Sequence, residues 1–243
     1  MRRSTYVHCE MVRNFRNKRY LFFSLLWPLV LYLTIAGSSR RSHFDGVSFP
    51  LYFMTGMAAF GSMVAVVSIG GRIAVERAVG WTKQIRISPL SVGTYFTSKM
   101  LCAYVMAFIT IAGICLAGTA LGVRLSFTEW ATVLGLLLVG LVPFALLGIG
   151  LGHLVSADSL TPAVGGIVTL FALLGGSYGF LIAKSGVLFD VIKGLPSYWL
   201  VQAGKTAFKG NVWPIEGWVV VAIWSVALAP LAVLAYRHDN SQV

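Results

Sequence analysis

The sequence has few charged residues. Asp, Glu, Lys and Arg make up 11% of the 243 residues, against roughly 25% in a typical soluble domain. Hydrophobic residues make up 57%, so a soluble protein of this size would not have enough polar side chains to cover its surface. The composition excludes an ordinary soluble protein and indicates a membrane protein.

Several chemical signatures are also missing. The three cysteines, Cys9, Cys102 and Cys115, show neither a disulfide framework nor the Cys/His spacing of a metal site, so we expect no metal. There is no phosphate-binding P-loop, which excludes ATP binding by that route. Apart from Glu76, at the end of one apolar stretch, the apolar stretches contain no carboxylate. Because ion-coupled carriers usually need a carboxylate inside the membrane, the energy for any transport should come from elsewhere.

The net charge of +11 is common in nucleic-acid-binding proteins, but the basic residues here are differently placed. They lie mainly at the ends of apolar stretches, and they do not form a basic stripe with interleaved aromatic side chains. Basic residues at such positions orient membrane spans and contact anionic lipid. We therefore expect contacts with membrane lipid and no nucleic-acid partner.

Six apolar stretches have about the 20 residues that a membrane-spanning helix needs. They are Tyr20–Gly37, Phe49–Gly71, Tyr95–Gly122, Trp130–Val155, Leu160–Ala183 and Trp218–Tyr236. The fourth and fifth are separated only by residues 156–159, which predicts a tight helical hairpin with Asp158 or Ser159 capping the fifth helix. The fold class we expect is an all-α polytopic membrane protein with six transmembrane helices.

An even number of spans places both termini on one side of the membrane. Twelve of the 19 Lys and Arg residues lie on that side. The positive-inside rule then puts both termini in the cytoplasm.

Residues 1–19 form a polar arm before the first span. Val7, Met11 and Phe15 recur every four residues and would share one face of a helix. This pattern predicts an amphipathic helix in the membrane interface. The alternative is a disordered basic arm that only fixes orientation.

Two further polar segments interrupt the apolar pattern. Residues 72–94 are charged and compatible with a helix, and they must lie in water or at the headgroups because charge is costly inside a bilayer. Residues 184–214 contain two apolar pieces that are too short to span, which predicts re-entrant or interfacial helices on the outer side. The outer region is either a gate or a surface loop anchored by aromatic side chains.

The glycine-rich segment Gly175–Gly179, which contains Ser177, can be interpreted in two ways. Gly175–Gly179 matches the G-x-S-x-G pattern of a hydrolase nucleophile, and His153 is the only histidine within a span. An intramembrane serine protease using Ser177 and His153 is therefore one alternative. The other is that these small residues pack or bend a helix end. Pairs with GxxxG spacing, Gly118/Gly122, Gly148/Gly152 and Gly175/Gly179, favour close packing of helices.

Taken together, these elements resemble the permease subunit of type-2 ABC exporters. Members of that family carry an E-R-x-x-G-T-like segment after the second span, ending in [ST]-P-[IL], and a G-K pair at the start of the third span. This sequence has Glu76, Arg77, Gly80, Arg86, Ser88, Pro89, Leu90 and Lys99 in that order, although Trp81 interrupts the Gly-Thr pair and Ser98 replaces the glycine before Lys99. A second match is Leu195–Trp199, which is similar to the family's outer proline-aromatic element.

The resemblance implies a single permease domain over residues 1–243 that is a transport subunit and not an enzyme. It would lie in the bacterial cytoplasmic membrane and pair with a second permease, identical or related. Two ATPase subunits holding ATP and Mg would dock on its cytoplasmic side, against a coupling helix in residues 72–94. The residues expected at that contact are Glu76, Arg77, Gly80, Lys83, Arg86 and Pro89.

The resemblance also implies a substrate path between the two permeases, along the first, second and fifth spans. The residues expected on the path or at the outer gate are Phe53, Phe60, Phe171, Tyr178, Phe180, Pro196, Tyr198 and Trp199. An apolar path favours export of a hydrophobic or amphipathic cargo, such as a drug, antibiotic or lipid-like molecule. Alternatives are export of a polysaccharide, an ion-coupled carrier or channel, and the serine protease.

Overall fold

The computed structural model describes residues 3–44, 46–80, 92–183, 185–206, 208, 210 and 212–241. In these residues the helices are α1 (Arg3–Phe15), α2 (Lys18–Leu21), the π-helix η1 (Phe22–Leu26), α3 (Trp27–Ser38), α4 (Phe49–Val67), α5 (Ile69–Ala78), α7 (Val92–Ala120), α8 (Phe127–Gly140), α9 (Val142–Leu154), α10 (Ala157–Gly175), α11 (Val187–Lys193), α12 (Pro196–Thr206) and α13 (Ile215–Ser241). A hairpin of β1 (His43–Phe44) and β2 (Val47–Ser48) precedes α4, with Phe44 paired to Val47.

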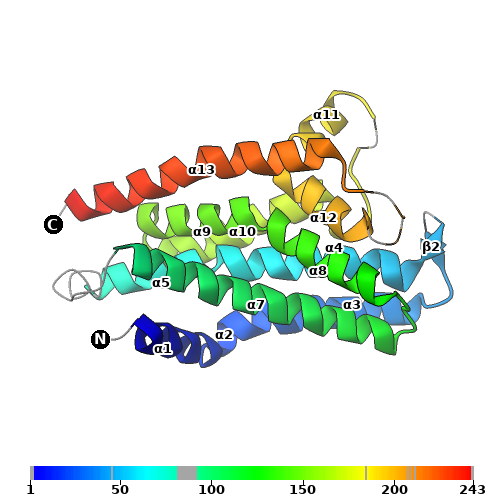
Figure 1. Cartoon of the computed structure of the whole chain (residues 1–243), viewed down its shortest axis with the longest axis horizontal. Coiled ribbons are helices and arrows are strands. Elements are labelled where there is room, and N and C mark those ends of the chain that lie inside the picture. Colours follow the sequence, from blue (N-terminus) through cyan, green and yellow to red (C-terminus); the bar gives the residue numbers. More distant parts are fainter. Residues whose placement is uncertain are drawn as a thin grey trace.

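The long helices run side by side along one axis, and both ends of the chain lie at the same end of the bundle (Figure 1). We call it the terminal end. The opposite end, which carries the β-hairpin, α11 and part of α12, is called the distal end. The even number of crossings that the sequence predicts accounts for this arrangement.

Five helical runs are long and apolar enough to cross a membrane. They are Phe49–Ala78, Gly93–Ala120, Phe127–Leu154, Ala157–Gly175 and Ile215–Arg237. The predicted first span corresponds to a shorter apolar helix, Phe22–Ser38, which at 1.5 Å per residue is about 25 Å long and near the lower limit for spanning. These helices confirm an all-α polytopic membrane protein.

Two predicted boundaries around the fifth span are wrong. The helix starts earlier than expected, with Ser156 as its N-cap, so Asp158 lies inside the first turn. It also ends at Gly175, eight residues before Ala183, because Gly176 adopts the left-handed conformation at φ 78°. A residue in this conformation ends a helix, and glycine adopts it without steric cost.

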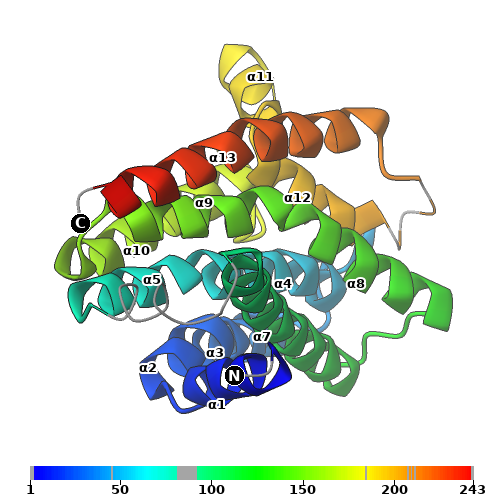
Figure 2. The ribbon, with the colours of Figure 1, turned by 60° about the vertical axis from the view of Figure 1, so that its left-hand side comes forward.

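Helix α4 is the centre of the molecule. In Figure 2 it lies with α5 between α1, α3 and α7 on one side and α9, α10, α12 and α13 on the other. All but three of its 19 residues are buried. By contrast, only 22% of the apolar window in α10 and 17% of that in α13 is buried. The second span is therefore enclosed by the rest of the chain, whereas the fifth span leaves most of its apolar surface uncovered.

Glycines bring α9 against the junction of α4 and α5. A Cβ atom on Gly70 would lie 2.2 Å from the carbonyl oxygen of Gly148, and one on Gly152 would lie 2.7 Å from the carbonyl oxygen of Gly70. Such distances leave no room for any side chain at either position. The predicted GxxxG pair Gly148/Gly152 thus allows α9 to approach the end of the second span with direct backbone contact.

Candidate functional site: a buried ion cluster at the terminal end

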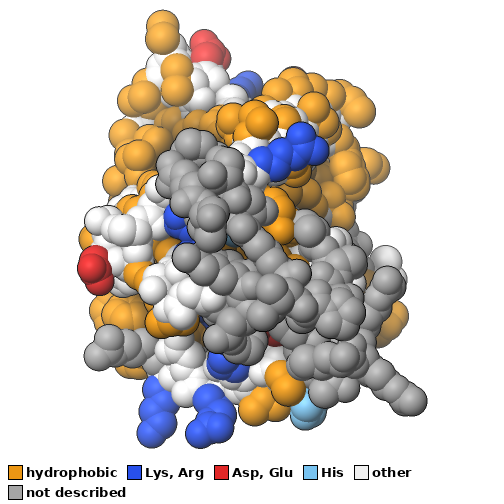
Figure 3. All heavy atoms as spheres, turned by 90° about the vertical axis from the view of Figure 1, so that its left-hand side faces the viewer, with side chains coloured by type: hydrophobic (Ala, Val, Ile, Leu, Met, Phe, Trp, Pro, Cys, Tyr) orange, Lys and Arg blue, Asp and Glu red, His pale blue; other side chains and the backbone are white. Residues whose placement is uncertain are grey.

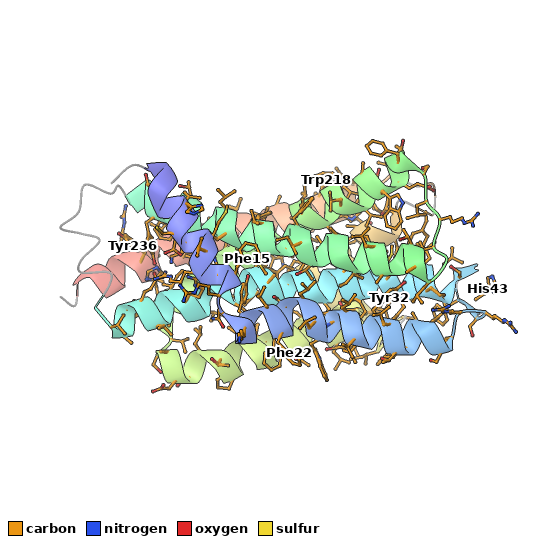
Figure 4. The ribbon with its side chains drawn as sticks, turned by 90° about the horizontal axis from the view of Figure 1, so that it is seen from below. Phe15, Phe22, Tyr32, His43, Trp218 and Tyr236 are labelled. Carbon is orange, nitrogen blue, oxygen red and sulfur yellow. The ribbon has the colours of Figure 1, made fainter. Side chains whose placement is uncertain are left out.

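Helix α1 lies across the terminal end and turns polar residues toward the bundle. Figure 4 shows it crossing the long helices near Tyr236, whereas His43 marks the distal end. Glu10 and Asn14 are 3% and 1% exposed, but Phe15 is 43% exposed. The predicted helix is present, yet the face that packs on the bundle is centred on Glu10 and Asn14 and not on the apolar side chains.

The buried face of α1 contributes to an ion cluster formed with α5 and α7. Its members are Glu10, Arg13, Arg72, Glu76, Tyr95 and Lys99. At its centre, the Nζ atom of Lys99 lies 2.6 Å from Oε1 of Glu76 and 2.9 Å from Oε2 of Glu10. The side chain of Lys99 is fully buried, and those of Glu10 and Glu76 are 3% and 6% exposed. One lysine of the third span therefore joins the amphipathic arm to the end of the second span.

The remaining members complete the contacts of the two carboxylates. Nη2 of Arg13 lies 2.6 Å from Oε1 of Glu10, and the same guanidinium also pairs with Glu76. Arg72 approaches Oε2 of Glu10 at 3.5 Å. The hydroxyl of Tyr95 donates a hydrogen bond of 3.3 Å to Oε2 of Glu76. Three cations thus surround two carboxylates, which offsets the cost of removing these charges from water.

Glu10 has a pKa below its usual value. Burial by itself would raise the pKa of this carboxyl, but the charge and hydrogen bond of Lys99 lower it, as do the charges of Arg13 and Arg72, and the net shift is downward. The ionised form of Glu10 is therefore favoured in the folded protein. Charge on Glu10 and docking of α1 stabilise each other.

Arg77 contacts the end of α9. Its guanidinium donates hydrogen bonds of 3.1 and 3.3 Å to the carbonyl oxygens of Gly152 and Val155. These carbonyls lie at the C-terminal end of α9, where a helix leaves its last acceptors without intrahelical donors. The contact adds to the close backbone packing of Gly152 on Gly70 and fixes the end of the second span.

The structure separates the residues expected at the ATPase contact into two groups. Glu76 and Arg77 lie in the last turn of α5, and both bond within the chain. Gly80 follows the helix at φ 72°, with nothing within 4 Å of its would-be Cβ. Lys83, Arg86 and Pro89 lie outside the described residues. Glu76 is thus buried in this conformation, whereas the sequence analysis expected it to face a partner.

The terminal face around these residues is rich in positive charge. Figure 3 looks onto this end of the molecule and shows Lys and Arg side chains beside the residues that are not described. Lys or Arg side chains also project at its lower edge. Basic residues at one end of a membrane bundle suit the side that faces the cytoplasm.

The residues expected on the substrate path do not form one continuous lining. Phe53 is 2% exposed and stacks on Phe49 with ring centroids 5.5 Å apart, and Phe60 contacts Tyr178 at 5.4 Å. Phe171 packs on Phe144 at the same centroid distance, in a different interface. These contacts are those of side chains that pack the core.

The residues expected at the outer gate differ in their burial. Pro196 and Trp199 of α12 are buried, and Tyr198 of the same helix is half-buried. Phe180 is 54% exposed beyond the end of α10. Of the predicted set, Phe180 is exposed, and Phe171, Tyr178 and Tyr198 are partly buried, so these four retain some surface in this conformation.

The serine protease alternative fails on distance. His153 lies just before α10 and Ser177 just after it. A helix of 19 residues separates them, which is about 28 Å at 1.5 Å per residue. The Ser177 side chain is fully buried and its hydroxyl has no hydrogen-bond partner among the described residues. Within one chain, Ser177 and His153 cannot act as nucleophile and base.

Sequence reasoning missed Glu10. The periodic pattern of the arm comes from its apolar residues, and Glu10 is its one carboxylate, in an otherwise polar and basic segment. The signal was Lys99, a lysine several residues inside an apolar stretch, because a cation at such a position needs a carboxylate nearby. The arm and the end of the second span offered the nearest candidates.

Comparison with known proteins identifies the family. The sequence profile of ABC-2 family transporter proteins matches residues 34–236. The chain is also 27% identical over 209 residues to a Bacillus subtilis (strain 168) protein named "Putative transport permease YvfS", covering 82% of this chain and 85% of that protein. The match to the family profile begins in the last turns of α3, ends within α13, and includes Glu76 and Lys99 of the ion cluster. The chain belongs to the ABC-2 family of transporter proteins, and it is a multi-pass membrane permease.

Proposed function

We propose that this chain is the permease of an ATP-driven exporter in the bacterial cytoplasmic membrane, with both termini in the cytoplasm. Family membership implies an ABC ATPase partner in a transporter complex, and the permease is then a transport subunit without catalysis of its own. Two ATPase subunits would hold ATP and Mg, and a second permease, identical or related, would complete the path.

The ion pair between Glu76 and Lys99 is the observation that carries this proposal. Residues 81–91 join α5 to α7, and this 2.6 Å contact links the last turn of α5 to the first turns of α7. A force applied to residues 81–91 would therefore reach both helices together. Through Glu10 it would also reach α1.

In this mechanism the ATPase contacts come from the segment itself. Lys83 and Arg86 would supply the cationic groups, and Pro89, as a residue that cannot extend a helix, would end the coupling helix. Glu76 does not contact the ATPase itself in this proposal. It positions the end of α5, from which residues 81–91 follow. Closure of the ATPase subunits would then move α5, α7 and α1 as a unit and switch the cavity between the two sides.

The cargo we propose is hydrophobic or amphipathic. Support comes from the fifth span, where only 22% of the apolar window of α10 is buried and Leu170 is 57% exposed, so that a path along this span would be apolar. A polysaccharide would need rows of hydrogen-bonding side chains along such a path. The experiment is to reconstitute the complex with its ATPase in liposomes and to measure ATP hydrolysis with added amphiphiles or soluble oligosaccharides. Stimulation by amphiphiles alone supports the proposal, and stimulation by oligosaccharides alone overturns the choice of cargo.

A further inference from the structure

A pocket of about 220 Å³ opens at the distal end, far from the ion cluster. One wall is a face of α12 carrying Tyr198, Gln202 and Lys205, which are spaced four and three residues apart. Thr206 at the end of α12, Lys193 at the end of α11 and Glu216 at the start of α13 complete the polar lining.

Two tryptophans hold the walls of this pocket together. Nε1 of Trp199 donates a hydrogen bond of 2.7 Å to the carbonyl oxygen of Lys193, and Nε1 of Trp224 donates one of 2.8 Å to that of Gly194. These bonds tie the turn between α11 and α12 to α12 itself and to α13. The pocket is thus formed without a ligand, which lowers the entropic cost of binding one.

The lining favours an anion. Lys205 is only 4% exposed, and its Nζ atom lies 3.9 Å from the ring centroid of Tyr52. Nζ of Lys193 lies 4.9 Å from the ring centroid of Phe189. Gln202 adds amide donors, and burial raises the pKa of Tyr198, so that its hydroxyl stays protonated and able to donate. Against these donors the pocket has one carboxylate, Glu216.

The size and rim of the pocket favour a headgroup over a whole molecule. Pockets that enclose drug-sized ligands measure about 300–1,000 Å³, which is larger than this one. Val212, which lines the pocket, is 89% exposed, and Ile215, between the lining residues Pro214 and Glu216, is 74% exposed. Helix α11, which carries Val187, projects from the bundle at this end (Figures 1 and 2). In a membrane protein such a rim suits acyl chains at the boundary of the bilayer.

We propose that this pocket binds the headgroup of an anionic phospholipid. Lys193 and Lys205 attract the phosphate, and Gln202 donates hydrogen bonds to its oxygens. Glu216 accepts a hydrogen bond from a headgroup hydroxyl, as in phosphatidylglycerol, and the exposed apolar rim contacts the acyl chains. The site would act at the distal end whatever cargo the permease moves, and it does not depend on ATPase docking.

Native mass spectrometry of the purified full chain tests this site. The chain in a non-ionic detergent is given equal amounts of phosphatidylglycerol and phosphatidylcholine, and the lipids that stay bound are counted. We expect the wild type to retain phosphatidylglycerol preferentially. Lys193→Gln and Lys205→Gln should each reduce this preference about tenfold, because each removes one charged hydrogen bond. Arg124→Gln is the matched control, since Arg124 is exposed outside the pocket.

Three results would overturn the proposal. One is a wild type that retains both lipids equally. Another is an unchanged preference in the two lysine variants, with thermal unfolding confirming that both are folded. The third is complete displacement of phosphatidylglycerol by excess inorganic phosphate, which would mean that the pocket takes a free anion. Because Lys193 is the more exposed of the two lysines, Lys193→Gln keeps the test decisive even if Lys205→Gln does not fold.

Discussion

At the scale of single residues, Lys99 has no exposed side-chain surface, and its ammonium group lies within hydrogen-bond distance of two carboxylates from different helices. Removing one member of a buried ion pair leaves the other charge without compensation, at a cost of about 3–5 kcal/mol. Removing Lys99 should cost more stability than this, because Glu10 and Glu76 would then repel each other without the cation between them. Arg13 and Arg72 remain, but Arg13 is 45% exposed and is screened by water.

Replacing Lys99 by methionine should therefore destabilise the protein strongly. Methionine keeps an unbranched side chain, one heavy atom shorter than that of lysine, and removes the charge. We expect the midpoint of thermal unfolding in detergent to fall by more than about 5 °C. Lys18→Met, at an exposed position before the first span, is the control and should leave the midpoint unchanged. A Lys99→Met protein that unfolds at the wild-type temperature would mean that the ion cluster contributes nothing to stability.

Docking of α1 should depend on the ionisation of Glu10. Its pKa is lower in the folded protein than in the unfolded chain, so the stabilisation is fully present above the unfolded value of about 4.5. It is lost as pH falls through the lowered pKa of the folded state. At neutral pH the helix should thus be held on the bundle, and in acid it should be released.

A spin label on Cys9 would follow this release, because Cys9 is exposed on α1. With Cys102 and Cys115 replaced by alanine, we expect an immobilised spectrum at pH 7 and a mobile one at a pH below the lowered pKa of Glu10. Glu10→Gln should give the mobile spectrum throughout. A spectrum of the wild-type side chain that stays the same between these pH values would contradict the role assigned to Glu10.

At the scale of secondary-structure elements, the contact between α5 and α9 sets the position of the second span. Gly70, Gly148 and Gly152 let the two backbones touch, and Arg77 closes the same contact through the carbonyls at the end of α9. The ion cluster and this contact lie on opposite faces of α5. The end of the second span is thereby held from both sides.

Gly70→Ala should separate α5 from α9. The new Cβ atom would lie 2.2 Å from a backbone oxygen, which cannot move away as a flexible side chain would. We expect a loss of about 1–3 kcal/mol or more, seen as a lower midpoint of thermal unfolding. The matched control is Gly135→Ala in α8, where nothing lies within 4 Å, and helix propensity predicts an equal or higher midpoint. Equal midpoints for wild type and Gly70→Ala would show that the helices can separate at no cost.

The spans could be predicted from sequence because length and hydropathy alone set them. The boundaries that failed were set by local conformation. The fifth span ended where Gly176 takes a positive φ, and no charged residue marked that point. The ion cluster could be predicted only in part, since Glu76 and Lys99 stood in a recognisable order but Glu10 is 89 residues from Lys99 along the chain. Burial of Glu76 likewise depends on helices distant in sequence.

At the scale of the whole molecule, the two ends of the bundle carry different chemistry. The terminal end holds the ion cluster, both ends of the chain and the root of residues 81–91. The distal end holds the pocket of α11, α12 and α13. Between them, α10 and α13 leave most of their apolar windows uncovered, and lipid and a second permease are the partners that suit such faces. This difference between the two ends fits a permease that is driven by an ATPase at the terminal end and opens at the distal end.

A mild-detergent purification of the tagged chain from its native host tests the proposed ATPase partnership most directly. We expect a nucleotide-hydrolysing subunit to be recovered with the wild type and with Arg124→Gln. A Lys83→Glu and Arg86→Glu double variant should lose that subunit and still unfold at the wild-type temperature, because charge reversal repels the partner without touching the ion cluster. Recovery of the permease with no nucleotide-hydrolysing subunit, in several detergents, would contradict the central claim.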